Sequence, residues 1–295
     1  MSVYNGAGSP ISSVYNSSGN IIQTAYNSNG DIVYNGGSED FLRICTYNVG
    51  QWYIGNSQPI PTEFKTAYAD LQTTIFDHVQ PDVCFMQEAT TLFCEDGTLA
   101  ETFLSTWLDN VEITRGNIGY QAHMLATNGI EIEDYQALPF TNAVGNYPGY
   151  ETAYITVNGK RIFLVNTHIS TNQEYQELQC AEMLELVSDK ESFILCGDFN
   201  TVIYADKTQV DWTNCIKPFA DAGYNLANGG EFGVFPTYWR TGDPNPSDGY
   251  TPATDMIITS PDIDIVNVYT DSTKLYDTLT GDKIDHIPLV AEVRL

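Results

Sequence analysis

The segment KIDHIPLV, at residues 283–290, places an acid and an imidazole side by side before a short apolar run. The run continues to Val293 and has the composition of a buried strand. An ionisable pair at the start of a buried strand is costly unless the pair has partners or chemistry to perform. Asp285 and His286 are therefore candidate functional residues, although such a pair is a weak signal by itself.

Three further segments have the same character, because each ends an apolar stretch with an oxygen-bearing side chain. They are CTYN at residues 45–48, FMQE at residues 85–88 and LCGDFN at residues 195–200. Four such segments in one chain are a strong indication of a functional site.

Two of these segments have the chemistry of a cation site. Mg²⁺ prefers oxygen donors and usually takes one or two carboxylates. Glu88 is the first candidate ligand, Asn48 adds a neutral oxygen, and Asp285 supplies the next one. The plainer alternatives are a solvated glutamate at a strand end and an asparagine that forms a turn before Gly50.

The segment LCGDFN offers groups that suit a phosphate. A glycine lets the backbone bend or approach closely, and side chains two apart point to one side of an extended chain. Asp198 and Asn200 can then accept a proton and donate a hydrogen bond to the same phosphate. The alternative is an ordinary Asp/Asn β-turn, which the other clusters make less attractive.

The chain has four histidines, of which two end strand-like runs beside polar clusters. These two are His168, in VNTH at residues 165–168, and His286. His78 is most simply a histidine on a helix face. His123 fits either the core or a cleft.

The charge balance limits the partners. The chain of 295 residues has 12 basic and 38 acidic residues, for a net charge of −26. This acidity disfavours tight, salt-driven nucleic-acid binding, which needs clustered Lys and Arg. A phosphodiester that meets the protein across a divalent cation is still compatible with it.

Three features of the sequence bear on where in the cell the protein is found: its apolar runs, its N-terminus and its cysteines. No run of eighteen apolar residues occurs, and the N-terminus lacks the basic start and apolar region of a secretory signal. Cys45, Cys84 and Cys196 lie in apolar runs, where we expect reduced, buried thiols. We therefore predict a cytoplasmic protein without a membrane span.

Residues 1–40 differ in composition from the rest. Tyr-Asn pairs recur there, each followed by Asn, Ser or Gly. This pattern predicts short hairpins or coils of a small Gly/Asn/Tyr-rich repeat. The segment fits either a flexible polar leader or an attachment module that docks on a larger assembly, of a phage or of a surface.

From residue 41 onward, strand patterns alternate with helical ones. We expect helices at residues 63–80, 100–108 and 173–188, the last with Tyr175, Leu178, Ala181, Leu184 and Val187 on one face. Asn158-Gly159 predicts a two-residue hairpin turn. Hairpins mixed with helical crossovers predict mixed sheets covered by helices, in an α/β sandwich over residues 41–295.

Residues 41–295 also resemble the endonuclease/exonuclease/phosphatase superfamily, which has the fold of deoxyribonuclease I. Six segments carry the resemblance, in the order of the family: TYNV at 46–49, MQE at 86–88, NTH at 166–168, GDFN at 197–200, TDMI at 254–257 and IDHIP at 284–288. The resemblance implies an α/β (α+β) four-layer sandwich of two mixed sheets flanked by helices. It also implies hydrolysis of a phosphodiester or phosphomonoester with Mg²⁺, or with Mn²⁺ or Ca²⁺ in its place.

The resemblance further implies roles for single residues. Glu88 is the main metal ligand, with Asn48 and Asp285 completing the site. Asp198 and Asn200 bind the phosphate and orient the attacking water. Asp255 orients His286. His168 binds a phosphate oxygen or assists the leaving group. Both His286 and Asp198 stay open as the general base.

Departures from the family pattern bear on the substrate. His168 stands where abasic-site endonucleases carry a tyrosine, which favours the deoxyribonuclease-like and lipid-phosphodiesterase branches. Tyr150 is a candidate substrate-binding residue, because it falls near the position where deoxyribonuclease I carries a substrate-contacting arginine; the replacement weakens that contact with DNA. On the loop before Asp255, the residues that could bind substrate by stacking or by charge are Tyr238, Trp239 and Arg240; aromatic packing under a long loop is the alternative.

We therefore predict a Mg²⁺-dependent phosphohydrolase, first of all a non-specific endonuclease of the deoxyribonuclease type that acts on DNA. The alternative enzyme is a phosphatase or phosphodiesterase for a lipid headgroup, nucleotide or sugar phosphate, which the acidity favours. A catalytically silent binding module is disfavoured, because every expected position is filled. The substrate, the role of residues 1–40 and the oligomeric state stay open.

Overall fold

The computed structural model describes residues 41–48, 78–88, 108, 110–113, 123–145, 147–204, 206–238, 252–271 and 286–295, and four short strands before residue 41. The chain divides into two compact units, Met1–Phe41 and Leu42–Leu295. In the first unit, two antiparallel pairs form: β1 (Val14–Tyr15) with β2 (Ile21–Ile22), and β3 (Thr24–Tyr26) with β4 (Ile32–Asn35). The attachment role of this segment stays a prediction.

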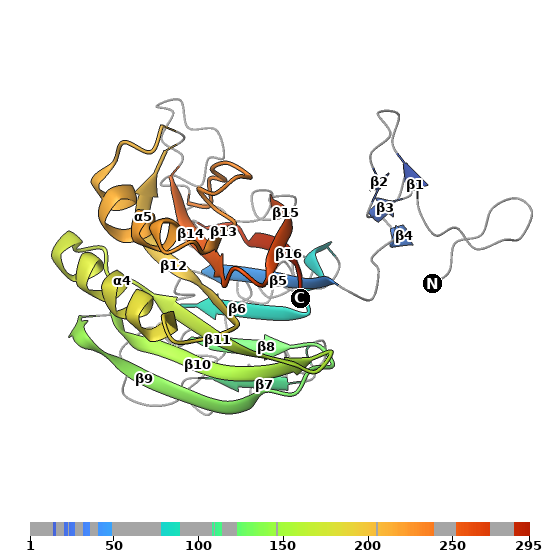
Figure 1. The fold of residues 1–295 in the computed structure, drawn as a ribbon, viewed down its shortest axis with the longest axis horizontal. Helices are drawn as coiled ribbons and strands as arrows, with labels where there is room; N and C mark the ends of the chain where they lie inside the picture. The colour runs from blue at the N-terminus through green and yellow to red at the C-terminus, as the bar shows by residue number, and fades with distance from the viewer. Residues whose placement is uncertain are drawn as a thin grey trace, which may run out of the picture. The chain divides into compact units, whose positions relative to one another are not determined.

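The second unit contains two six-stranded sheets (Figure 1). The first has the order β13 (Asn225–Leu226), β14 (Ala253–Thr259), β12 (Phe193–Ile203), β11 (Lys160–His168), β10 (Tyr147–Val157), β9 (Glu133–Val144). The second has the order β15 (Asp264–Thr270), β16 (Leu289–Arg294), β5 (Phe41–Asn48), β6 (Val83–Gln87), β8 (Met124–Thr127), β7 (Asn110–Ile113).

Both sheets are mixed, as predicted. β11 runs parallel to β12 and β5 runs parallel to β6, whereas β9, β10 and β11 are successively antiparallel. This confirms the predicted α/β sandwich. The expected helices at residues 63–80 and 100–108 lie almost entirely outside the described residues, so the outer layer on the second sheet stays a prediction.

The predicted hairpin joins β10 to β11. Val157 pairs with Lys160 across the turn, and Asn158 and Gly159 have φ angles of 52° and 80°. Two consecutive positive φ angles are typical of the type I′ turn, whose twist matches that of the flanking strands. The register of the whole hairpin follows from this turn.

Helix α4 (Gln173–Val187) connects β11 to β12, and its N-cap is Asn172, whose side chain accepts a hydrogen bond from Glu174 N. The predicted helix is confirmed, but the five residues expected on one face do not share it: Val187 is buried, whereas Leu178 is 44% exposed. The reason is that residues three apart drift around a helix with 3.6 residues per turn. The side chains that are buried are Gln176, Gln179, Cys180, Met183 and Val187.

The first sheet separates two hydrophobic cores. One core lies between the sheets and includes Ile44 and Phe85 from one sheet and Leu164 from the other. The second core lies between the first sheet and α4, with the helical segments η2 (Trp212–Ile216) and α5 (Lys217–Asp221) adding to it. Because side chains alternate along a strand, β11 sends Leu164 toward the other sheet and Val165 toward the helices. Asn166 and His168 continue the face that meets the other sheet.

Among the described residues, no helix is long and apolar enough to span a membrane. The thiols of Cys45, Cys84 and Cys196 are free and buried, as the sequence predicts.

Gly197 is held in a conformation that only glycine tolerates. Its φ is +154°, and a Cβ added there would lie 2.0 Å from the carbonyl oxygen of Thr167 on the neighbouring strand. We expect Gly197→Ala to lower the free energy of unfolding by about 3 kcal/mol or more, because backbone must move to accept the methyl group. Urea unfolding measures this.

Gly223→Ala is the matched control. Gly223 also has a positive φ, +84°, but an added Cβ would meet nothing within 4 Å. We expect it to cost about 1–2 kcal/mol, the strain of the left-handed backbone alone. Equal losses in the two variants would contradict the close approach of β11 and β12.

Candidate active site

Three ionisable side chains lie in one row across the first sheet. His168 on β11 pairs in register with Asp198 on β12, and Asp198 pairs with Asp255 on β14. Residues in register across neighbouring strands share a face of the sheet. The predicted segments NTH, GDFN and TDMI therefore meet at one place.

Asp198 is at the centre of the cluster. Its Oδ2 lies 3.4 Å from Nε2 of His168 and 3.5 Å from Nε2 of His286, and it accepts a hydrogen bond of 2.9 Å from Nδ2 of Asn48. Its Oδ1 accepts from the backbone N–H of Asn200 at 2.7 Å. The carboxylate thus joins the two imidazoles and the ends of both sheets.

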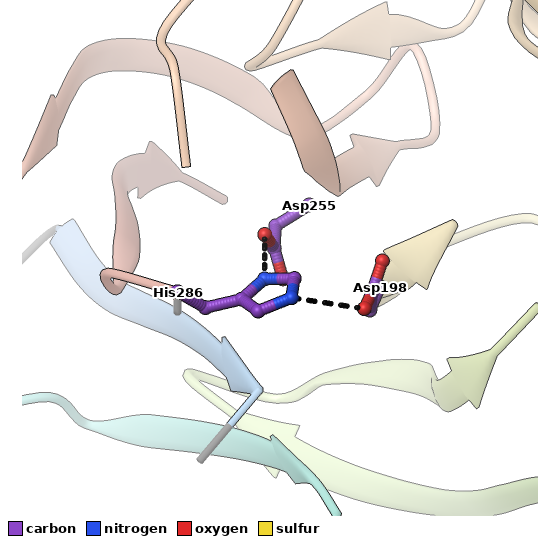
Figure 2. A group of neighbouring side chains, drawn as sticks. All are labelled: Asp198, Asp255 and His286. Atoms are coloured by element: carbon purple, nitrogen blue, oxygen red, sulfur yellow. Dashed lines mark hydrogen bonds and ion pairs between the residues drawn. The ribbon is translucent and has the colours of Figure 1, made fainter. Parts of the chain in front are cut away.

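His286 is held from its other side by Asp255, as Figure 2 shows. Nδ1 of His286 and Oδ2 of Asp255 are 2.9 Å apart, and the hydroxyl of Thr254 donates to the same oxygen at 3.0 Å. A carboxylate at Nδ1 favours the tautomer with its proton there, so that Nε2 faces Asp198 as the basic nitrogen. The ring of Tyr238 lies 5.0 Å from the imidazole of His286.

Glu88 and Asn48 come from the second sheet. Nδ2 of Asn48 lies 3.3 Å from Oε1 of Glu88, and that oxygen is 3.9 Å from Nε2 of His168. Glu88 has a φ of 53° and Asn200 a φ of 50°, both in the left-handed region that few non-glycine residues adopt. Such strain often occurs at functional sites, where the surroundings enforce it.

The register between β12 and β14 is irregular beyond this row. The pairing passes from Asp198 opposite Asp255 to Ile203 opposite Ala253, so β12 has extra residues there. Irregularities of this kind re-aim side chains next to active sites. Here the irregularity directs the side chain of Asn200 toward β11, so that Nδ2 of Asn200 lies 2.9 Å from Nε2 of His168.

The two aspartates have pKa values shifted in opposite directions. Burial raises the pKa of Asp198, but the charges of His286 and His168 and the hydrogen bonds from His168 and Asn48 outweigh it and lower the value to about 2. Burial raises the pKa of Asp255 above its ordinary value, against the opposing charge of His286. Asp198 is therefore ionised at neutral pH, as a group that receives or orients protons must be.

The pKa values of His168 and His123 are also shifted in opposite directions. Burial lowers the pKa of His168, but the hydrogen bond and charge of Asp198, with the charge of Glu88, raise it above its ordinary value. His123 is buried, and burial together with the charge of His168 lowers its pKa to about 3. His123 is therefore a neutral imidazole near the site. Its burial favours the core position over the cleft, the two alternatives that the sequence leaves open.

The donors present fit a hard divalent cation at Glu88. Glu88 has the most open carboxylate of the cluster, with its side chain 17% exposed against 1% for Asp198, and Asn48 adds an amide oxygen. Asp198, Asp255 and His286 also lie close enough to hold a metal ion. That trio suits proton transfer better, because the Asp255–His286 hydrogen bond already uses two of its donor atoms and Mg²⁺ prefers oxygen.

The structure brings together most of the predicted site residues and separates others. Those in the cluster are Asn48, Glu88, His168, Asp198, Asn200, Tyr238, Asp255 and His286. Tyr150 lies elsewhere, in the core beneath α4, where its ring is 5.3 Å from that of Phe140. Asp285, Trp239 and Arg240 lie outside the described residues.

Some supporting residues had no predicted role. Thr237 is buried, and its hydroxyl accepts hydrogen bonds from the backbone of Thr254 and Asp255 at 3.1 Å each. Asn228 donates to the carbonyl oxygen of Asp255 at 3.1 Å. These residues stand in a loop-like stretch, where polar side chains are ordinary, so the sequence gave no signal for them.

Asp255→Asn tests the coupling to His286. The amide can still accept from Nδ1, but it no longer stabilises a protonated imidazole, so we expect kcat for phosphodiester hydrolysis to fall about 10²-fold. Asp262→Asn is the control, because Asp262 pairs with Lys160 at 2.7 Å, away from the cluster. An unchanged kcat in Asp255→Asn would remove His286 from the proton transfer.

Comparisons with known proteins bear on the fold. No protein-family model matches the chain. The 5′-tyrosyl-DNA phosphodiesterase of Caenorhabditis elegans is 25% identical over 108 residues, which are 37% of this chain and only 28% of that protein's length. A solved endonuclease/exonuclease/phosphatase protein from Beutenbergia cavernae has a TM-score of 0.64 at 17% identity, covering 87% of this chain and 72% of that one. An AP endonuclease from Archaeoglobus fulgidus has a TM-score of 0.61 at 18% identity, covering 85% and 98%.

At these identities the structural similarity establishes the fold. The chain has the fold of the endonuclease/exonuclease/phosphatase superfamily, as its sequence segments predict. The solved proteins with this fold include the AP endonuclease from Archaeoglobus fulgidus and TDP2 of Caenorhabditis elegans.

Proposed function

We propose that this chain, which has the fold of the endonuclease/exonuclease/phosphatase superfamily, is a metal-dependent phosphohydrolase that cleaves phosphodiesters by attack of water. One observation carries the proposal: the carboxylate of Asp198 lies within 3.5 Å of the Nε2 atoms of both His168 and His286. Two imidazoles around one ionised acid, with an amide beside them, offer proton acceptors for a water and hydrogen-bond donors for a phosphoryl group.

The side chains divide the work of hydrolysis. A phosphodiester needs its oxygens neutralised, its water activated and its leaving oxygen stabilised. His286, held by Asp255, accepts the proton of the water at Nε2, or Asp198 accepts it directly. His168 has a raised pKa, so it carries the proton that a phosphate oxygen or the leaving group needs.

A divalent cation completes the set. Glu88 and Asn48 would hold it, together with Asp285, for which the sequence is the only basis. When bound, Mg²⁺ would polarise a phosphoryl oxygen and neutralise its charge. Asn200 then orients the phosphate beside His168, at a position fixed by the bend in β12.

Nucleic acid is the substrate class that we place first. The proteins compared above are named for a tyrosyl-DNA phosphodiester and for AP endonuclease activity. We expect Tyr238, whose ring lies 5.0 Å from that of His286, to stack on a base next to the cleaved bond. We therefore infer a non-specific endonuclease of the deoxyribonuclease type.

A second candidate is a phosphatase or phosphodiesterase for small phosphoesters such as lipid headgroups, nucleotides or sugar phosphates. The observation that favours it is the net charge of −26, with only 12 basic residues in the chain. A polyanion is repelled at long range by such a protein. A small phosphoester is repelled less strongly because it carries fewer charges.

A substrate panel separates the two candidates. Supercoiled plasmid, a 5′-phosphotyrosyl oligonucleotide and a set of small phosphoesters would each be incubated with Mg²⁺ and with EDTA. Nicking of the plasmid, dependent on Mg²⁺ and lost in His286→Ala, would establish an endonuclease. An intact plasmid beside hydrolysed small esters would establish the second candidate.

A further inference from the structure

A layer of buried polar side chains crosses the core between the two sheets next to the candidate active site. Its members, which we call the polar layer, are Thr46 on β5, Gln87 on β6, Glu151 on β10 and Asn166 on β11. Each of them is at most 1% exposed. Thr46 and Asn166 lie two residues before Asn48 and His168, on the same faces of their strands.

The surroundings of this layer are apolar. Along β11 the preceding residue on the same face is Leu164, and along β10 the next one is Ala153; both are fully buried. Burying amides and a carboxylate among such residues costs free energy unless their hydrogen bonds are made. A buried polar network that is well satisfied also fixes one arrangement of the elements that it joins.

Asn166 makes the bonds that join the sheets. Its Nδ2 donates to the carbonyl oxygens of Met86 on β6 and Met124 on β8, at 3.0 and 3.1 Å. Its Oδ1 accepts from Nε2 of Gln87 at 2.8 Å. One carboxamide on the first sheet is thus bonded to two strands of the second sheet.

Glu151 sets the orientation of that carboxamide. It stands opposite Asn166 in the β10–β11 register, and its Oε2 accepts from Nδ2 of Asn166 at 2.9 Å. Because both oxygens of Glu151 act as acceptors here, they select the Nδ2 side of the amide. Its other oxygen accepts from the hydroxyl of Tyr135 at 2.7 Å, which anchors it to β9.

The polar layer also reaches the proposed metal side of the site. Gln87 precedes Glu88 and donates to the hydroxyl of Thr46 at 3.2 Å as well as to Asn166. The left-handed backbone of Glu88, with φ of 53°, breaks the strand alternation, so that both side chains meet the first sheet. Glu88 and His168 therefore face each other from the two sheets, and the hydrogen bond between Gln87 and Asn166 joins the sheets next to them.

We propose that Asn166 is a positioning residue of the active site, which acts through Gln87 to hold Glu88 at its distance from His168 and Asp198. The inference rests on the proposed function, since it assigns Glu88 to the cation and the other two residues to the phosphate. Asn166 touches neither the cation nor the substrate. Its loss lets the two sheets shift relative to each other and separates the two halves of the site.

The test compares Asn166→Leu and Gln87→Met with Leu164→Ala. Both substitutions replace an amide by an apolar side chain of similar shape. Asn166→Leu removes every bond that the Asn166 carboxamide makes to the second sheet. Gln87→Met removes the bonds to Asn166 and Thr46 but leaves both backbone bonds of Asn166 intact, so it is the variant expected to fold. Leu164→Ala, on the same strand, lowers stability without touching the polar layer. For each variant we would measure urea unfolding, Mg²⁺ binding by calorimetry, and kcat and KM on a soluble phosphodiester.

We expect Asn166→Leu and Gln87→Met to weaken Mg²⁺ binding and to lower kcat, each by roughly 10–100-fold, as the loss of supporting bonds around a ligand does. KM should change little, and Leu164→Ala should bind Mg²⁺ and turn over substrate as the wild type does. If Asn166→Leu does not fold, Gln87→Met decides. If Asn166→Leu and Gln87→Met bind Mg²⁺ and turn over substrate as Leu164→Ala does, and the wild type is active, the inference is wrong but the proposed function stands. A wild type that neither binds Mg²⁺ nor hydrolyses any phosphoester would overturn the proposed function, and the inference with it.

Discussion

Asp198→Asn is expected to lower kcat for phosphodiester hydrolysis by about 10²–10⁴-fold, the range of a lost acid–base group. The substitution keeps the shape and an oxygen that can accept from Asn48, but it removes the charge that both imidazoles face. His168 then loses the main interaction that raises its pKa, so it is less protonated at neutral pH. The measurement is the initial rate of hydrolysis of a soluble phosphodiester at saturating Mg²⁺.

Asp211→Asn is the matched control for this prediction. Asp211 accepts a hydrogen bond of 2.7 Å from Val202 N, on the same strand as Asp198, and takes no part in the cluster. Its replacement should leave kcat unchanged. A fall of similar size in both variants would mean that Asp198 acts only through the stability of β12.

Glu88→Gln is expected to weaken Mg²⁺ binding by at least roughly 10–100-fold, a range seen for groups that only support a ligand. An amide is a poorer ligand than a carboxylate for a hard cation, and the charge of Glu88 no longer offsets that of the metal. Activity should fall in step and recover in part at high Mg²⁺. Calorimetric titration with Mg²⁺ measures the binding, independently of turnover.

Glu133→Gln controls for the general loss of a negative charge. Glu133 lies on β9 and pairs with Arg161 at 3.4 Å on the surface. It should bind Mg²⁺ as the wild type does. If Glu88→Gln also binds Mg²⁺ as the wild type does, the cation sits elsewhere, and the trio of Asp198, Asp255 and His286 becomes the better candidate.

The site could be predicted from sequence because its residues end apolar strands. Asp198 and His168 each close such a run, and the parallel pairing of β11 with β12 brings the two ends together. Glu88 and Asn48 do the same on the second sheet. An acid or imidazole directly after several buried residues is unusual enough to be recognised without a structure.

The packing of α4 could not be predicted in this way. Its buried face holds two glutamines, which make hydrogen bonds to the backbone: Gln176 donates to Asn200 O at 2.8 Å and Gln179 to Asn142 O at 3.1 Å. Apolar periodicity overlooks such residues, because it treats polar side chains as exposed. The polar layer had no predicted role for the same reason. Thr46, Gln87 and Asn166 stand in the quoted segments, but apolar periodicity does not predict buried polar side chains, and Glu151 interrupts a strand whose alternation would otherwise predict an apolar residue there.

The position of Tyr150 shows a second limit. Its place in the sequence suggested a substrate contact, but side-chain direction depends on strand register. The turn at Asn158-Gly159 pairs Tyr150 with Thr167, one residue before His168, and so turns its ring toward the helices. A one-residue step along a strand reverses the face.

The central claim is that the cluster around Asp198 hydrolyses phosphodiesters with the help of a divalent cation. The most direct test is release of p-nitrophenol from bis(p-nitrophenyl) phosphate, an activated diester that needs no nucleic-acid binding. The wild type should release it with Mg²⁺ and stop on addition of EDTA, and Asp198→Asn should be almost inactive. Release that persists in EDTA and in Asp198→Asn, or no release by the wild type at any Mg²⁺ concentration, would contradict the claim.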